Sequence, residues 1–273
     1  MVRVLSHLDK WHLEHLKQFA YAGKIRLPRK PVNILSNFSI CDGKYQCLRV
    51  GKENRSKVQN FMLDNFYAIA PVPVVLELFK DRKMTDYLED ELDLFCDNGV
   101  SFGVFHGNKV VGAGLNLFVE KPSQNIEYIG AKEWHNRAAT FASKNSDQNP
   151  VHLWRNSQFL HLHHFCQRVI GENSAKFGLH LSSLSLDEDY RGKDGITHQL
   201  IKTICDQVWD QGGVLTTVAN FTAFEVYLRK HFPGHVHLLD RVPYSDLEFT
   251  VNGKRVFKHL ETLDSIRYLA LVR

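Results

Sequence analysis

The stretch LSLDEDYRGKDGITHQL, residues 184–200, decides the fold of this chain. It begins as an alternating, strand-like segment, passes through a short basic loop with Gly192 and Gly195, and continues as an amphipathic helical pattern from Thr197. This order creates an anion site, because the N–H groups at a helix N-terminus have no intrahelical acceptors and the helix dipole favours negative charge there. An ordinary strand-to-helix turn with surface cations is the alternative interpretation.

The loop contains the chemical groups that a pyrophosphate requires. Gly192 and Gly195 allow the backbone to approach a ligand closely, while Arg191 and Lys193 supply positive charge. Asp194 is an anion in the same loop. It either weakens phosphate binding or turns outward to cap the following helix.

A second motif follows directly. Residues 214–218 predict a strand and residues 222–230 a helix, and Asn220, Ala223 and Tyr227 recur at spacings of three and four. These three residues therefore share one helical face, on which the small alanine leaves room for a flat or extended ligand. A half-buried tyrosine that only packs is the alternative.

The remaining patterns alternate strands with helices. Strands are predicted at 45–50, 179–186, 235–240 and 267–272, a hairpin at 101–118, and helices at 6–20, 54–66, 74–79, 84–95, 151–169 and 197–209. Residues 120–150 are predicted to be irregular, apart from a short helix around Trp134. The alternation predicts an α/β or α+β fold with a central sheet.

Composition argues against several functional classes. Among 273 residues, 34 are Lys or Arg and 30 are Asp or Glu, and the two signs are interspersed, which is not typical of a nucleic-acid-binding stripe. The five cysteines are widely spaced without a CxxC pair, so we expect free thiols in a reducing compartment. No stretch approaches the ~18 apolar residues of a membrane span, and the first residues lack a signal-peptide core, so we expect a cytoplasmic protein.

Together, in this order and spacing, the two motifs resemble those of the GNAT acetyltransferases. Members of that superfamily carry an Arg-x-x-Gly-x-Gly/Ala loop after a bulged strand and an Asn-x-x-Ala/Ser-x-x-x-Tyr helix after the next strand. The resemblance covers residues 44–273 and implies an α/β (α+β) domain with a central mixed, mostly antiparallel sheet flanked by helices; residues 1–43 are expected to form an N-terminal helical extension. Within the superfamily the chain is most similar to the invertebrate arylalkylamine (dopamine-type) N-acetyltransferases. Three features carry this finer resemblance: the helix that ends at Phe66 with Pro71 soon after, the hairpin Phe105–Phe118 and the stretch Arg255–Lys258.

The resemblance implies an acetyl-CoA-dependent N-acyltransferase that acts on a small primary amine without a metal. The family's pyrophosphate loop falls on Arg191, Gly192, Lys193, Gly195, Ile196 and Thr197. Leu184 and Leu186 match positions whose backbone binds the pantetheine arm, and Asn220 matches a contact to the cofactor. Tyr227 matches the residue that often protonates the departing CoA thiolate.

The chain also departs from the family's pattern. Its loop is one residue longer between Arg191 and Gly195. The glutamate that acts as base in the dopamine-type enzymes, directly before a proline, is Ala70 here, so that base is not carried over. The serine pair of those enzymes falls on Val218 and Thr222, which retains one hydroxyl.

The strand before the loop contains a candidate for the missing base. The His-x-His pair of the vertebrate branch falls on His180 and Ser182, so half of the pair is present. An amine arrives protonated and must lose a proton before or during its attack on the thioester, and His180 is the best-placed acceptor. A packing role for His180 is the alternative. The candidate catalytic residues are therefore Tyr227, His180, Ser182 and Thr222.

Three further clusters have simpler interpretations. His161, His163 and His164 do not all converge on one ion from a single helix, so we expect a helix surface with a few histidines. The acidic run 187–189 predicts a solvated turn, or a patch that attracts a cationic amine. Five aromatic residues either line an aromatic amine pocket or pack in the core: Phe66, Tyr67, Phe102, Phe118 and Phe159.

The function predicted from the sequence is direct transfer of an acetyl group to a small primary amine, of the arylalkylamine type. An N-acyltransferase for polyamines or amino acids, or one that uses a longer acyl donor, is a second possibility. A non-catalytic acyl-CoA-binding protein is a third, favoured by Ala70 and by the altered loop.

Overall fold

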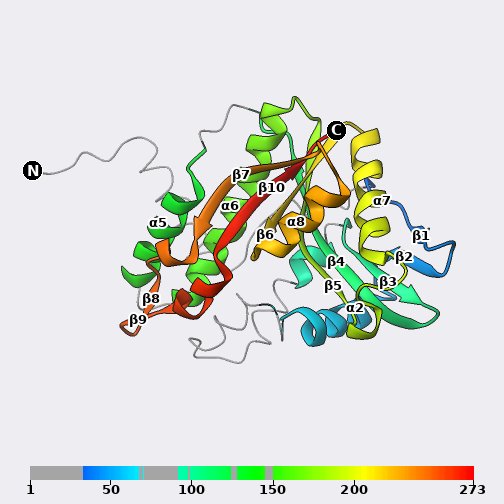
Figure 1. Cartoon of the computed structure of the whole chain (residues 1–273), viewed down its shortest axis with the longest axis horizontal. Coiled ribbons are helices and arrows are strands. Elements are labelled where there is room, and N and C mark those ends of the chain that lie inside the picture. Colours follow the sequence, from blue (N-terminus) through cyan, green and yellow to red (C-terminus); the bar gives the residue numbers. More distant parts are fainter. Residues whose placement is uncertain (1–32, 68–69, 71–91, 98, 124–127, 145–149) are drawn as a thin grey trace, which may run out of the picture.

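The computed structural model describes residues 33–67, 70, 92–97, 99–123, 128–144 and 150–273. Within them the chain forms an eight-stranded sheet and a small two-stranded hairpin (Figure 1). All neighbouring strands of the large sheet are antiparallel except β5 and β6, which confirms the expected mixed, mostly antiparallel sheet. Across the sheet the strands are β1 (Phe38–Ile40), β2 (Tyr45–Arg49), β3 (Phe102–His106), β4 (Lys109–Glu120), β5 (Phe177–Leu186), β6 (Gly213–Ala219), β10 (Ser265–Leu271) and β7 (Val236–Pro243).

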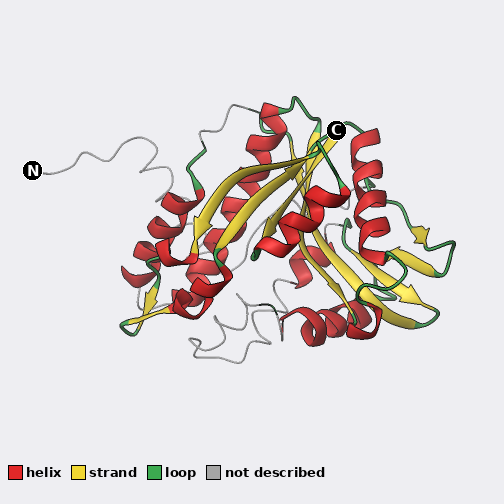
Figure 2. Cartoon of the chain, viewed as in Figure 1, coloured by secondary structure: helices red, strands yellow, loops and turns green. Residues whose placement is uncertain are grey.

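Helices cover both faces of this sheet (Figure 2). One face, called the α6 face below, carries α2 (Arg55–Met62), the π-helix η1 (Leu63–Tyr67), α5 (Ala131–Lys144), α6 (Pro150–Glu172) and the 3-10 helix η4 (Val256–Leu263). The opposite α7 face carries α7 (Ile196–Asp210) and α8 (Thr222–His231). Short connections contain η2 (Glu188–Tyr190), η3 (Tyr244–Asp246) and the hairpin strands β8 (Thr250–Val251) and β9 (Lys254–Arg255).

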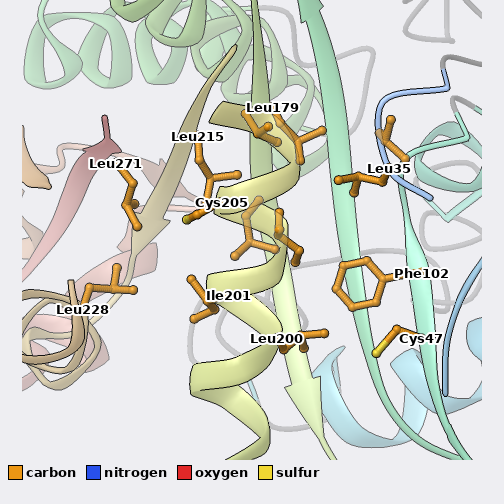
Figure 3. Close-up of a cluster of buried hydrophobic side chains, with 14 of the residues drawn as sticks. Leu35, Cys47, Phe102, Leu179, Leu200, Ile201, Cys205, Leu215, Leu228 and Leu271 are labelled. Carbon is orange, nitrogen blue, oxygen red and sulfur yellow. The ribbon is translucent and has the colours of Figure 1, made fainter. Parts of the chain in front are cut away.

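The alternation of side chains along the central strands divides the core between the two faces. On β10, Tyr268 and Ala270 belong to the cluster under α6, whereas Leu269 and Leu271 belong to the cluster under α7. Figure 3 shows Leu271 in this second cluster, which also contains Ile201 of α7. Each fully buried Leu or Ile side chain contributes about 2 kcal/mol. Packing of side chains against the helices on both faces therefore stabilises the sheet.

The helix expected around Trp134 is present, but it is longer than predicted. Helix α5 is 14 residues long, and it packs on the sheet together with α6. Its buried positions are largely small: Ala131, Ala138, Ala139 and Ala142. Alanine is the strongest helix former but gives a weak apolar signal, so the periodicity of this helix is faint in the sequence.

The other predicted elements within the described residues are present, with ends that differ by a few residues. The expected helices at 6–20 and 74–79 lie outside the described residues; of the expected helix at 84–95, residues 92–95 are described and helical. Strand β1 precedes the domain boundary expected at residue 43 and pairs with β2. Among the described helices, none is long and apolar enough to cross a membrane.

Candidate active site

The two parallel strands at the centre of the sheet separate along their length. β5 pairs with β6 only as far as Leu181 and Thr217, but it pairs with β4 as far as Leu186 and Gly112. At the last shared position, Thr217 Oγ1 donates a hydrogen bond of 2.8 Å to the Leu181 carbonyl. Beyond it, the described residues place no strand against the β6 side of β5. That open edge can pair with the backbone-like amides of an extended ligand.

A β-bulge lies where the strands separate. The β4–β5 register shifts so that Leu115 pairs with Ser183 and Asn116 with Leu181, which leaves Ser182 as the extra residue. The bulge changes which side chains face each helix layer. Leu181 before it and Leu184 after it both contact the α7-face cluster. Leu184 and Leu186 lie beyond Leu181, on the part of β5 that pairs with β4 but not with β6.

The basic loop follows the open strand and leads into α7. Gly192, Asp194 and Gly195 all have positive φ, of 73°, 53° and 64°. Gly195 immediately precedes the helix, whose first N–H groups point out of its N-terminus. Arg191 Nε donates a hydrogen bond of 2.9 Å to the Leu186 carbonyl, which holds the guanidinium at the end of β5. The exposed loop, the Arg191 side chain and the helix N-terminus thus lie close together, an arrangement that suits an anion.

Asp194 does not cap the helix. Its carboxylate accepts hydrogen bonds from Lys44 Nζ at 2.5 Å and from the Tyr45 hydroxyl at 2.8 Å, and the N-cap of α7 has no side-chain hydrogen bond. These bonds lower the pKa of Asp194 and keep it ionised. The negative charge is therefore paired with a cation of the β1–β2 turn.

In the acidic run 187–189, beside the loop, Asp187 is held by contacts within the protein. Asp187 accepts a hydrogen bond from the backbone N–H of Asp189 at 3.0 Å and forms an ion pair with Lys109 at 2.8 Å. Glu188 and Asp189 are exposed. This agrees with the predicted solvated turn beside the loop.

The residues after β6 are held by hydrogen bonds from η3 and β10. The Asn220 carbonyl accepts a hydrogen bond of 3.2 Å from the Tyr244 hydroxyl. Thr222, the first residue of α8, accepts one of 2.8 Å from Arg267 Nη2. Arg267 is buried on β10 and also forms ion pairs with Glu225, at 2.9 Å, and with Asp264. The Thr222 hydroxyl therefore helps to fix the start of α8.

Tyr227 lies half-buried on α8 and packs against the α7-face cluster. Its ring lies parallel to that of Phe224, with centroids 6.4 Å apart, and 4.4 Å from the ring of His231. Burial raises the pKa of the phenol, so it stays protonated at neutral pH. The protonated phenol is a weak acid on a partly exposed side chain.

His180 is buried on the α6 face of β5, with only 1% of its surface exposed. Its Nδ1 is 2.9 Å from Thr216 Oγ1, and its Nε2 has no hydrogen-bond partner among the described residues. Burial lowers the pKa of the ring to about 3. The imidazole is therefore neutral at neutral pH.

The histidines of α6 differ from the expectation of a helix surface. His161 and His164 are buried, and their rings contact Trp134 with centroids 5.2 Å and 5.5 Å away. Within the described residues, no group of three His, Cys, Asp or Glu residues is placed to hold a metal ion. The helix-surface interpretation is wrong for His161 and His164, because the flanking helix α5 covers them.

The five aromatic candidates divide between the faces. Phe159 and Tyr67 are buried in the cluster under α2 and α6, and Phe66 packs against it. Phe102 and Phe118 belong to the α7-face cluster. Phe66, Tyr67 and Phe159 therefore lie on the side of the sheet that His180 faces, whereas Phe102 and Phe118 lie on the other side.

Sequence reasoning missed several residues that shape this site. Arg267 and Glu225 fix the start of α8, and Thr216 and Thr217 hold the strands at the point of separation. One signal was available: Arg267 is a charged residue inside the otherwise buried strand Ser265–Leu271. A buried arginine requires partners.

Comparison with known proteins finds similar structures but no similar sequence. No family model matches the chain, and no curated protein matches its sequence. Solved structures do match. Arylalkylamine N-acetyltransferase 2 from Aedes aegypti is 16% identical, with a TM-score of 0.60 over 84% of this chain and 98% of that one. A Drosophila melanogaster polyamine N-acetyltransferase that forms N-acetylagmatine is 16% identical, with a TM-score of 0.58 over 84% and 100%.

A further match is the C-terminal condensation domain of Ebony in complex with β-alanyl-dopamine, 18% identical, with a TM-score of 0.52 over 84% of this chain and 99% of that domain. The chain thus has the fold of the GNAT acetyltransferases. Within that fold, the insect arylalkylamine and polyamine N-acetyltransferases are among the structures that it resembles.

Proposed function

We propose that this chain is an acyltransferase that moves the acetyl group of acetyl-CoA to the nitrogen of a small primary amine. The observation that carries the proposal is the separation of β5 from β6 directly before the Arg191–Thr197 loop. It combines an open strand edge, for a ligand with amide groups, with an anion site at the end of the same strand. A molecule with a peptide-like arm and a pyrophosphate fits both.

The residues present fit acetyl-CoA in three places. The backbone at Gly192, Gly195, Ile196 and Thr197 and the charges of Arg191 and Lys193 suit the pyrophosphate. The open backbone at Leu184 and Leu186 suits the pantetheine amides. Asn220, the third place, directly follows β6, the strand from which β5 separates. Asp194 does not oppose this fit, because Lys44 pairs with it.

The transfer needs no covalent intermediate on the protein. The neutral amine nitrogen attacks the thioester carbon, the C–N bond forms and the C–S bond breaks. The nitrogen loses one proton to water as the amide forms, the thiolate takes one proton, and the group that donated it is reprotonated by water. Backbone N–H groups of the open β5 edge polarise the carbonyl. Tyr227 donates the proton to the thiolate, and its neutral phenol supports this role.

A protonated amine must also lose its ammonium proton before it can attack. A ring with a pKa of about 3 is a weak base at neutral pH, so His180 is a poor acceptor for an ammonium proton. We infer that the amine reaches the site as its free base and that His180 and Ser182 orient it. If so, the ratio of the His180→Ala rate to the wild-type rate should be the same at every pH. A loss confined to neutral pH would instead identify His180 as the base.

An arylalkylamine is the acceptor that we propose. Phe66, Tyr67 and Phe159 lie together on the face toward which His180 points, and aromatic side chains favour an aromatic ligand. The similar structures include enzymes named for arylalkylamines and one that forms N-acetylagmatine. A polyamine is therefore the competing acceptor.

A non-catalytic acyl-CoA-binding protein is the second candidate function. Ala70, at the position of the family's base, is buried with 8% of its surface exposed and has no group that takes up a proton. This observation favours binding without turnover.

Two measurements on the whole chain separate these functions. The melting temperature is recorded with acetyl-CoA and with CoA, and free thiol release is then followed with tryptamine, dopamine, agmatine and spermidine. We expect stabilisation by acetyl-CoA and thiol release with an arylalkylamine. Stabilisation without release on any amine supports the binding protein, and no stabilisation refutes the cofactor assignment.

A further inference from the structure

The turn between β1 and β2 contacts the candidate pyrophosphate loop, and both have left-handed backbone conformations. The turn between β1 and β2 has positive φ at Cys41, Asp42 and Gly43, of 55°, 53° and 84°. The loop before α7 has positive φ at Asp194 and at its two glycines. For residues other than glycine such conformations are costly and persist only where neighbouring structure holds them.

The contacts between the turns converge on Asp194. Its carboxylate accepts hydrogen bonds from Lys44 and Tyr45, and its carbonyl accepts one from the Cys41 thiol at 3.3 Å. Gln199 of α7 completes the contact, because its Oε1 accepts a hydrogen bond of 2.8 Å from the Cys41 backbone N–H. Both backbone and side chain of Asp194 are thus held by the β1–β2 turn.

The members of this cluster differ in exposure. Tyr45 is buried, with 1% of its surface exposed, and its ring contacts those of His106 and Tyr190. The Lys44 and Asp194 side chains are 48% and 38% exposed. The tyrosine hydroxyl is therefore a fixed donor, while the lysine supplies a partly solvated charge. An aspartate here orders the loop without leaving a net negative charge near the phosphates.

We propose that Lys44 and Tyr45 are positioning residues for the pyrophosphate loop and that they act through Asp194. This inference rests on the proposed function. It explains how a loop with one additional, acidic residue keeps a shape that binds an anion. It also assigns a role in cofactor binding to the β1–β2 turn, which is remote in sequence from the cofactor motif.

The proposal and its opposite predict opposite signs for one substitution. If Asp194 only repels phosphate, Asp194→Asn tightens CoA binding. If Asp194 holds the loop, the same change weakens binding, because the amide accepts hydrogen bonds less well and no longer attracts Lys44. Asp189→Asn is the matched control, since it removes an exposed carboxylate from the neighbouring turn without touching these contacts.

The experiment measures CoA affinity by calorimetry for wild type, Asp194→Asn, Tyr45→Phe, Lys44→Met, Lys44→Arg and Asp189→Asn. We expect roughly five- to tenfold weaker binding for the first three variants, partial recovery with Lys44→Arg, and no weakening with Asp189→Asn. The double variant Lys44→Met with Asp194→Asn should bind no more weakly than the worse single variant. In turnover assays the KM for acetyl-CoA should rise while kcat is retained.

Amide hydrogen exchange of residues 192–198, without ligand, is the second readout. Exchange should become faster in Asp194→Asn and Lys44→Met and remain unchanged in Asp189→Asn. Equal or tighter CoA binding by Asp194→Asn overturns the proposal. If wild type does not bind CoA, the proposed function fails, and unchanged exchange in the variants then refutes the positioning role independently.

Discussion

Acidification should destabilise this protein through His180, and the size of the effect follows from its burial. The ring is buried in the folded state, where its pKa is about 3, against 6.5 for an ordinary histidine. Between these values the unfolded chain binds a proton that the folded protein does not. The stability contribution is therefore complete above about pH 6.5 and is lost as the pH falls toward 3.

The magnitude can be worked from the two pKa values. Each pH unit within this window costs about 1.4 kcal/mol per histidine, so lowering the pH from about 7 to about 5 removes roughly 2 kcal/mol through His180. His135, whose pKa burial also lowers to about 3, contributes a similar loss. The free energy of unfolding should therefore fall by roughly 4 kcal/mol through these two residues over this range.

Urea unfolding at several pH values tests this for wild type and His180→Asn. Asparagine keeps a hydrogen-bonding group near the Thr216 hydroxyl and does not titrate. The variant should lose about 2 kcal/mol less than wild type on acidification, whatever its stability at pH 7. His237→Asn, on the exposed strand position of β7, is the control. Equal acid losses in wild type and His180→Asn would show that the folded protein protonates His180, contrary to its burial.

Three further substitutions probe the candidate site and the residues that support it. Arg191→Glu should weaken CoA binding by roughly tenfold or more, because it replaces a charge-assisted contact with repulsion; unchanged calorimetry would contradict the anion site. Tyr227→Phe should retain acetyl-CoA affinity and lower kcat about 100-fold in steady-state assays; a loss of stability with normal turnover would make the ring a packing residue. Arg267→Met should lower the free energy of unfolding by about 2 to 3 kcal/mol in urea titrations. The loss is smaller than for an isolated buried ion pair because Arg229 still pairs with Glu225, and an unchanged unfolding midpoint would refute the buried network.

The strands and helices around the candidate site were predictable because they are encoded in short windows. The strand, the glycines and the helix of residues 184–200 need no distant residue to be recognised, since positive φ and helix starts depend on local backbone preferences. The motif of Asn220, just before α8, and Tyr227, within it, is equally local. The expected mixed, mostly antiparallel sheet followed from the family that these motifs resemble, and the comparisons confirm that fold.

Local patterns failed where burial depends on neighbours. The apolar face of α5 consists mainly of alanines, so its helix was expected to be short. His161 and His164 look polar on a helical wheel, yet α5 covers them with Trp134. His180 looked like a base, but its pKa depends on desolvation by the helices on the α6 face.

Long-range contacts decided the remaining features of the site. Lys44 and Asp194 are separated by 150 residues, and Thr222 and Arg267 by 45, so no window of sequence contains either pair. Whether Asp194 opposes or supports an anion site depends on where its carboxylate points. The folded β1–β2 turn fixes that direction, because only tertiary structure brings an ammonium group and a buried phenol within hydrogen-bonding distance of it.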